Sequence, residues 1–358
     1  MVRSRAVTGL RWALFLLADA GLLLLAWAAG MALATGGDRP AVTIGNTARS
    51  VAALPARGPD APIRFAVISD IEEGVESFRE ALRHFAGRPP DFVVIHGDLC
   101  QRPTREGFRY FLWQFRDAAW PGPFFCGAGN HDIADGGDLS LFRAHFGDER
   151  FAFRLGACQF LILNNCAGGL SEADYRWLET AAADPGPGPE IRHRFLFLHV
   201  PPLEAPKHEN VVRPRPAYGR LYDLAPRLRI RRVFSGNLHA YRRIEIGETA
   251  YVVCGGGGAD RQSPEAVPHL VEVVIEGDQI REEVVRLPEI HSPVEALDRF
   301  ACLYVGPWLL RHTAAAVPLV LGAFAALAWQ IARALRLIAG RRPAAGESQD
   351  VLQPPRTT

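Results

Sequence analysis

The sequence predicts an α/β fold built on a largely parallel sheet, with an apolar segment near each end of the chain. Two observations carry the prediction of the sheet. Between residues 63 and 126, apolar runs alternate with segments of helical period, which is typical of parallel strands joined by crossover helices. Several of these apolar runs also end in glycine followed by a polar side chain, as buried strands do where they enter tight turns. The length of 358 residues allows one large domain or two ordinary ones.

The expected elements follow one another in a regular order. The first half contains three strands and two helices: strands over 63–69, 91–96 and 124–126, and helices over 74–85 and 104–118. The second half is more mixed and contains hairpins over 151–163, 240–253 and 269–287, and single strands over 195–199 and 232–235. A further helix follows Ser171. Ser171 is placed to cap this helix, with Asp174 three residues further on.

Composition excludes some classes of function. The net charge is +1 and leaves no electrostatic footprint for nucleic acid. The six cysteines have no C-x-x-C spacing, which argues against a structural zinc knuckle. Cys100 and Cys126 follow neighbouring strands, and a location outside the cytoplasm would permit a disulfide between them without establishing one.

The two apolar segments predict membrane anchoring. They run over 12–34 and 313–331, and arginines precede the first and follow the second, which places both termini in the cytoplasm and the middle of the chain outside it. A cleaved signal peptide is an alternative for the first segment, and a buried amphipathic helix for the second. The expected organisation is an anchor or signal-anchor over 1–35, a linker over 36–61, a domain over 62–290, a juxtamembrane segment over 291–312, a transmembrane helix over 313–332 and a cytoplasmic tail over 333–358.

Polar side chains gather where the predicted strands end. They are Asp70 and Glu72, then Asp98, then Asn130, His131 and Asp132, then His199, and finally Asn237 and His239. In open α/β sheets ligands bind beyond the carboxyl ends of the strands, so these sets should converge on one crevice. Carboxylates and imidazoles at that density are the ligands that a divalent metal site needs.

This array resembles the calcineurin-like metallophosphoesterases, a family with D-x-H, G-D, G-N-H-D/E, H and G-H-x-H blocks in that order. The resemblance covers roughly residues 63–287. It implies two mixed β-sheets packed as a sandwich with flanking helices. It also implies two metals with a bridging carboxylate, and attack on the phosphorus of a phosphate mono- or diester by a metal-bound water or hydroxide.

Roles carry over by position. The resemblance implies that Asp70, Asp98 and His239 hold the first metal, with Asp98 bridging, and that Asn130 and His199 hold the second. His131 matches the histidine that steadies the phosphoryl group or protonates the leaving oxygen, with Asp132 behind it.

The sequence departs from the family pattern at two ligand positions. Glu72 stands where the first block has histidine, and Asn237 where the last block has its first histidine. A carboxylate-rich first position favours Mn²⁺ above all, with Mg²⁺, Ca²⁺, Fe or Zn²⁺ as further options. The chain should therefore hold one or two divalent ions.

A basic loop after His199 offers a place for the substrate. Its arginines Arg213, Arg215 and Arg220 are candidate contacts for a phosphate or an anionic head group, or they are merely solvated. The leading interpretation is a metal-dependent phosphoesterase at the outer face of the cytoplasmic membrane, acting on a lipid or envelope phosphate ester. The alternative, which Glu72 and Asn237 favour, is a catalytically weakened relative that serves as a binding or scaffold protein.

Overall fold

The structure is a computed structural model that describes residues 15, 17–30, 42–204, 212–260, 266–290 and 292–339. The chain divides into two compact units: Leu33–Leu303 forms one, and Met1–Ala32 with Tyr304–Thr358 forms the other. The sequence-predicted anchor, linker and tail lie partly outside the described residues.

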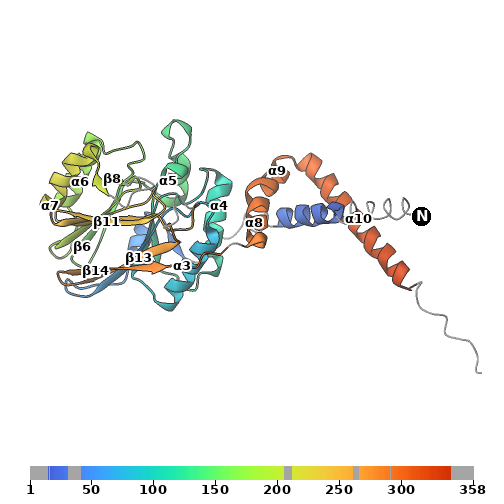
Figure 1. The fold of residues 1–358 in the computed structure, drawn as a ribbon, viewed down its shortest axis with the longest axis horizontal. Coiled ribbons are helices and arrows are strands. Elements are labelled where there is room, and N and C mark those ends of the chain that lie inside the picture. The colour runs from blue at the N-terminus through green and yellow to red at the C-terminus, as the bar shows by residue number, and fades with distance from the viewer. Residues whose placement is uncertain are drawn as a thin grey trace, which may run out of the picture. The chain divides into compact units, whose positions relative to one another are not determined.

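The unit Leu33–Leu303 contains two six-stranded mixed sheets (Figure 1). The first sheet has the order β1-β4-β3-β2-β13-β14, with β1 at Thr43–Ile44, β4 at Pro123–Gly127, β3 at Phe92–His96, β2 at Ile63–Ile68, β13 at His269–Glu276 and β14 at Gln279–Arg286. The second has the order β11-β12-β10-β7-β6-β5, with β11 at Tyr241–Ile246, β12 at Thr249–Cys254, β10 at Ile230–Ser235, β7 at His193–Phe197, β6 at Cys158–Ile162 and β5 at Phe151–Leu155. A small third sheet pairs β8 (Leu203–Glu204) with β9 (Arg213–Pro214).

Alternation of side chains along the strands builds the layers. In β2, Phe65 and Val67 lie in the core between the two sheets, whereas Ala66 and Ile68 face the helices outside. Aromatic rings fill the core between the sheets, and Phe65 packs edge-on against Phe195 of the second sheet with ring centroids 5.2 Å apart. The two-sheet sandwich that the family resemblance implied is therefore confirmed.

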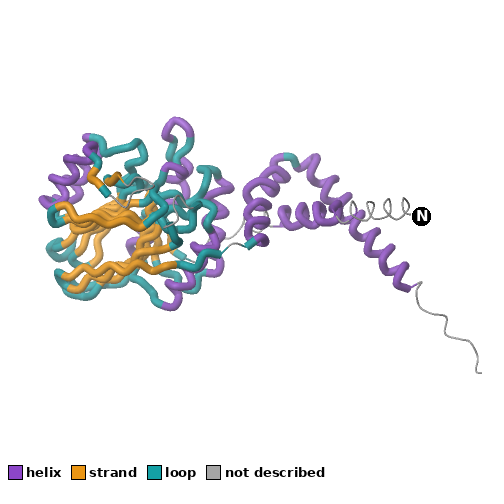
Figure 2. Tube along the Cα trace, in the orientation of Figure 1, coloured by secondary structure: helices purple, strands orange, loops and turns teal. Residues whose placement is uncertain are grey.

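Helices cover the outer face of each sheet (Figure 2). The first sheet is covered by α3 (Val75–Gly87), α4 (Arg105–Trp113) and α5 (Ser140–Phe146). The second is covered by α6 (Glu172–Ala183) and α7 (Gly219–Arg227). This unit also contains two short helices, α2 (Ala48–Ala52) near its start and α8 (Pro293–Phe300) near its end.

Most predicted elements are present. The strands β2, β3 and β4 pair in parallel, as strands joined by crossover helices do, and the three predicted hairpins are antiparallel pairs. Ser171 and Asp174 form the expected capping box of α6. The helix expected over 104–118 ends earlier, because α4 gives way to a 3₁₀ turn at Gln114, whose side-chain amide donates to the carbonyl of Tyr110.

The expected membrane-spanning helices are not found. Among the described residues, no helix is both long enough and apolar enough to cross a bilayer. The second unit contains helical residues 17–30, α9 (Gly306–Arg311) and α10 (Thr313–Ala339). The segment expected to span the membrane over 313–332 lies within α10. The extracytoplasmic placement of the domain stays an untested prediction.

The cysteines do not form disulfides. All six are free thiols, and Cys100 and Cys126 are both buried without a bridge between them.

Candidate metal centre

The site lies where strands of both sheets end. Asp70, Asp98 and Asn130 follow β2, β3 and β4 of the first sheet, and His199 and Asn237 follow β7 and β10 of the second. Parallel pairing places these strand ends at one edge, and the amide of Asp70 donates to the carbonyl of Gly97 over 3.1 Å. The strand-end rule therefore predicted the convergence correctly.

Backbone strain is concentrated at the same place. Among the described non-glycine residues, five have a positive φ, and four of them are site residues: Asp70 (60°), Glu72 (47°), Asp98 (51°) and Asn237 (59°). Non-glycine residues adopt this left-handed region at a cost, and they keep it where surrounding structure over-determines the conformation. The turns after the strands thus aim these side chains at one point.

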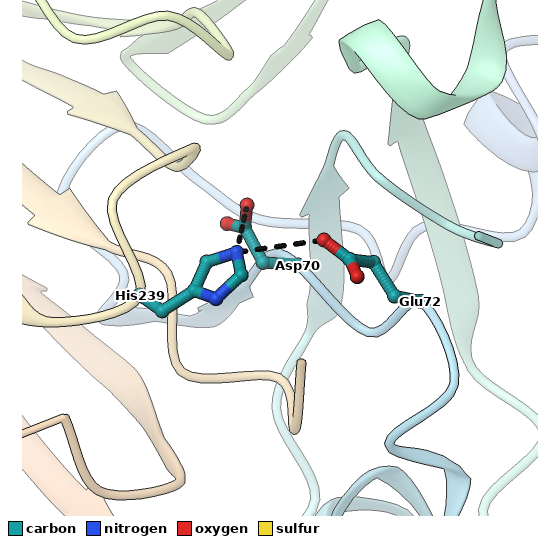
Figure 3. Close-up of side chains that lie close together, drawn as sticks. All are labelled: Asp70, Glu72 and His239. Carbon is teal, nitrogen blue, oxygen red and sulfur yellow. Dashed lines mark ion pairs between the residues drawn. The ribbon is translucent and has the colours of Figure 1, made fainter. Parts of the chain in front are cut away.

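The first group of candidate ligands is Asp70, Glu72 and His239, whose ligand atoms lie within 4.8 Å of one another. His239 Nε2 lies 3.6 Å from Asp70 Oδ1 and 3.4 Å from Glu72 Oε1, as Figure 3 shows. The other ring nitrogen, Nδ1, donates to the carbonyl of Asp260. That bond fixes the tautomer in which Nε2 has a free lone pair, as a metal-ligating imidazole needs.

The second group is centred on His199. Its Nε2 lies 3.1 Å from Asp98 Oδ2 and 3.1 Å from Asn130 Oδ1, and its Nδ1 lies 3.2 Å from the carbonyl of His96. Asp98 and His199 also form a close group with Asp70. Because Asp98 further belongs to a group with Glu72 and His131, its carboxylate stands between the two ligand sets, as a bridging ligand would.

Buried carboxylates and imidazoles shift one another's pKa values at the site. Burial raises the pKa of Asp70 to about 6, and the charge of Asp98 adds to the rise. Burial also acts to raise the pKa of Asp98, but the charge and hydrogen bond of His199 outweigh it, and this pKa ends below its ordinary value. Burial is the largest single influence on His199 and lowers its pKa, but the charge and hydrogen bond of Asp98, with the charges of Asp70 and Asp132, together outweigh it and raise the pKa to about 9. A divalent cation would satisfy these carboxylates, so the donor set fits such an ion.

His131 lies at the rim of the site. Its Nδ1 donates to the carbonyl of Gln101 over 3.0 Å, and its Nε2 faces Glu72 Oε1 at 3.9 Å. The side chain is about one-third exposed, so Nε2 can reach a bound molecule. The imidazole is thereby oriented without the help of Asp132.

Asp132 holds two loops rather than the His131 ring. Its carboxylate is buried and accepts hydrogen bonds from the amides of Leu99, at 3.1 and 3.2 Å, and Gly129, at 2.9 Å. The sequence placed this side chain behind His131, but the 3₁₀ turn over Asn130–Asp132 rotates the two side chains apart. Burial, together with the charge of Asp98, raises the pKa of Asp132 to about 7.

Asn237 acts through its backbone. Its amide donates to both carboxylate oxygens of Asp70, at 2.9 and 3.1 Å. The same contact steadies the ligand Asp70 whatever the side chain at 237 does. Metal ligation by the side chain of Asn237 stays a prediction.

The basic loop is only partly described, because 205–211 lie outside the described residues. Arg220 is engaged elsewhere: it pairs with Glu172 at 2.6 Å and stacks over the Tyr175 ring at 4.3 Å, both on α6. Arg213 belongs to β9 and Arg215 follows it. A substrate-binding role for Arg213 and Arg215 stays a prediction. For Arg220, the ion pair with Glu172 would have to break before the side chain could bind a substrate.

Asn165 is a residue that the sequence reasoning missed. Its buried Oδ1 accepts from the amides of His199 at 3.0 Å and Val200 at 2.9 Å, and its Nδ2 donates to Val200 O and Tyr218 Oη. It lies three residues after the end of β6, next to Asn164, so the strand-end rule applied to every strand would have found it.

Two glycines make room for the ligands. A Cβ on Gly129 would lie 2.1 Å from Asp98 Oδ1, and a Cβ on Gly97 would lie 2.2 Å from His199 Nδ1. Any side chain at these positions would displace a ligand, which explains the glycines that follow β3 and β4.

Comparison with known proteins agrees with this geometry. The family model described as calcineurin-like phosphoesterase matches residues 63–241, half of the chain. No curated protein matches the chain.

A solved structure shares the fold, and a second is similar at a lower score. A purple acid phosphatase from yellow lupin (Lupinus luteus) seeds is 15% identical with a TM-score of 0.55, and the match covers 65% of this chain and 53% of that one. The chain thus spans about half the length of this relative. A dimetal phosphatase from Danio rerio is 13% identical with a TM-score of 0.45, over 64% of this chain and 97% of that one. The family match over half of the chain shows that the chain belongs to the calcineurin-like phosphoesterase family, and the ligand geometry agrees with it.

Proposed function

We propose that this protein hydrolyses a phosphate mono- or diester with the help of one or two divalent cations held at the strand ends. The observation that carries the proposal is the close approach of ligand atoms from both sheets, with Asp70, Asp98 and His199 within 4.8 Å of one another. Neither sheet supplies this set alone, so the sandwich itself assembles the site.

The residues divide the work. Asp70, Glu72 and His239 would hold one cation, and Asp98, His199 and Asn130 the other, with Asp98 between them. Bound there, a divalent cation would supply Lewis-acid polarisation of the phosphoryl oxygens and a lowered pKa for attacking water. The carboxylate-rich first group favours a hard ion, and Mn²⁺ is the one we expect first.

His131 is placed to handle the leaving group. With Nδ1 donating to Gln101 O, the ring directs Nε2 toward the rim. In its protonated form it donates the Nε2 proton to the leaving oxygen as that oxygen separates from phosphorus. General acid help of this kind is worth ~10²–10⁴-fold in rate.

Substrate identity is not given by these contacts. A lipid or envelope ester was expected from membrane-spanning helices, and no such helix is found among the described residues.

The test combines metal content with turnover. The full chain, stripped of metal and reloaded with Mn²⁺, Mg²⁺, Ca²⁺ or Zn²⁺, is assayed on p-nitrophenyl phosphate and on bis(p-nitrophenyl) phosphate. We expect Mn²⁺ binding and hydrolysis of at least one ester, both abolished by Asp98→Ala. A chain that binds no metal and hydrolyses neither ester would instead be a binding or scaffold protein, the alternative that Glu72 and Asn237 favour.

A further inference from the structure

We propose that Arg299, on a helix beyond the segment that matches the family, is a positioning residue for the metal ligand Glu72. The inference rests on the proposed function in one respect, that Glu72 takes part in holding a cation. The observations that carry it are contacts of Arg299 with the loop that bears Glu72.

The loop between β2 and α3 needs support. Glu72 has a φ of +47°, and its amide and that of Ile71 both donate to the carbonyl of Asp98, at 3.0 and 2.9 Å. These two bonds fix the beginning of the loop. A strained residue keeps its conformation only where contacts on both sides constrain it, so the end of the loop must be held as well.

The Gly74 amide holds this end by donating to the Ile71 carbonyl over 2.7 Å, and Arg299 adds a side-chain constraint at Glu73 between them. Its guanidinium Nη1 donates to the carbonyl of Glu73, and its Nε lies 3.3 Å from the Glu73 carboxylate. Nη1 also lies 3.8 Å from the carboxylate of Glu76 in the first turn of α3. The side chain is 21% exposed, so solvent screens these charges less than it screens surface pairs. The planar fork of arginine thus clamps the residue next to Glu72.

The same helix makes a second, separable contact. Glu295 on α8 pairs with Arg79 on α3, which also donates to Gln114 over 2.8 Å. This pair docks α8 on the outer helices without touching the loop. Glu295→Gln is therefore a matched control that loosens the docking of α8 and leaves the contact of Arg299 with Glu73 in place.

The first readout is metal affinity. The metal-free full chain is titrated with Mn²⁺ by calorimetry. Arg299→Ala should weaken the tighter binding event ~10–100-fold, the usual effect of losing a group that orients a ligand. Arg299→Lys should recover part of the loss, and Glu295→Gln should stay within about twofold of wild type. Added to Glu72→Ala, Arg299→Ala should cause no further loss, because residues that act through one another are not additive.

The second readout needs no metal. In the metal-free chain, hydrogen exchange at the amides of Ile71 and Glu72 should accelerate ~10-fold or more in Arg299→Ala and remain slow in Glu295→Gln. Should Arg299→Ala not fold, Arg299→Lys and Glu73→Gln give the same comparison with side-chain volume kept.

Three outcomes would overturn the inference: wild-type affinity and exchange in Arg299→Ala, an equal loss in Glu295→Gln, or full additivity with Glu72→Ala. A wild-type chain that binds no Mn²⁺ would overturn the proposed function instead. In that case the exchange rates alone decide whether Arg299 holds the loop.

Discussion

The two ligand groups are built in different ways. In the second group, the side chains of His199 and Asp98 are 0% and 2% exposed, and Asn130 is its exposed member. The first group has one fully buried member, Asp70. In the first group, the side chains of His239 and Glu72 are 10% and 9% exposed and lie on turns that follow the strands. Ligands on turns need holding from outside, and the Asp260 carbonyl and Arg299 do this for the first group. The second group is held from within the fold instead. The Asn165 side chain accepts a hydrogen bond from the His199 amide, and the strands themselves position the rest.

This difference indicates which ligand group can accommodate a change of side chain. A carboxylate on a long arm, such as Glu72, can replace an imidazole where the surrounding turn can adapt to it. The second group has no such freedom, because its glycine neighbours leave no space for a shifted ligand. We therefore expect the first group to hold its ion tightly through charge, and the second to depend on geometry.

The largest effect should come from the residue that the groups share. Asp98→Ala should remove metal from both positions and lower turnover more than ~100-fold, beyond the effect of losing an orienting partner. Metal analysis of the purified variant, with circular dichroism as a check on folding, measures this. Asp135→Ala, in an exposed loop, is the control. If Asp98→Ala lost metal at one position only, the two groups would be independent.

The next largest effect should come from His131 at the rim of the site. Its Nε2 faces Glu72 at 3.9 Å, but we do not expect it to be an essential metal ligand. His131→Ala should lower turnover ~10²–10⁴-fold while metal content stays near that of wild type. Single-turnover assays on a substrate with a poor leaving group show the effect most clearly, because protonation of the leaving oxygen then matters most. Wild-type turnover on that substrate would show that His131 is not the acid.

A smaller effect should separate the two groups. Asn165→Leu keeps the volume but leaves the amides of His199 and Val200 unpaired, a cost of ~1–3 kcal/mol for each buried group. Mn²⁺ affinity of the second group should fall ~10–100-fold, and the first group should be unchanged. Asn165→Asp retains the hydrogen-bond acceptor, so the Mn²⁺ affinity of its second group should lie between those of the wild type and Asn165→Leu. Equal weakening of both Mn²⁺ binding events in calorimetry would contradict the division.

The smallest expected effect concerns metal removal. After dialysis we expect the first group to retain its ion and activity to rise when Mn²⁺ is added back, because a neutral amide is a poorer donor than imidazole for transition metals. Asn237→His should reduce the added Mn²⁺ needed for half-maximal activity a few-fold. Full activity after dialysis, with both ions retained, would show that the groups are equal in strength.

The sequence predicted the sheet and most of the site, for a physical reason. A buried strand has to be apolar and has to end in a turn, so a polar side chain directly after such a run is easily recognised. Asp70, Asp98 and His199 were found in this way. Asn165 satisfies the same rule but was overlooked, because it matches no block of the family.

Other features are not local in the sequence. Arg299 reaches the Glu73 carbonyl across more than two hundred positions of the chain, and no period or motif marks that contact. The direction of Asp132 depends on the rotation of one 3₁₀ turn, which spacing does not determine. The apolar C-terminal segment was interpreted from hydropathy, and among the described residues no helix meets the length and apolarity that a span needs.

The left-handed turns at the strand ends also limit which mutations the site accepts. Each such residue stores ~1–3 kcal/mol of strain, and asparagine, aspartate and histidine tolerate this conformation better than other side chains. Valine, isoleucine or threonine at Asp98 or Asn237 would lose both chemistry and backbone compatibility. We therefore expect only a few polar residue types to be tolerated at these two positions. At Asn237, where the backbone amide makes the contact with Asp70, replacement by glycine would relieve strain and keep that contact while removing the candidate ligand, so thermal stability and metal affinity should move in opposite directions there.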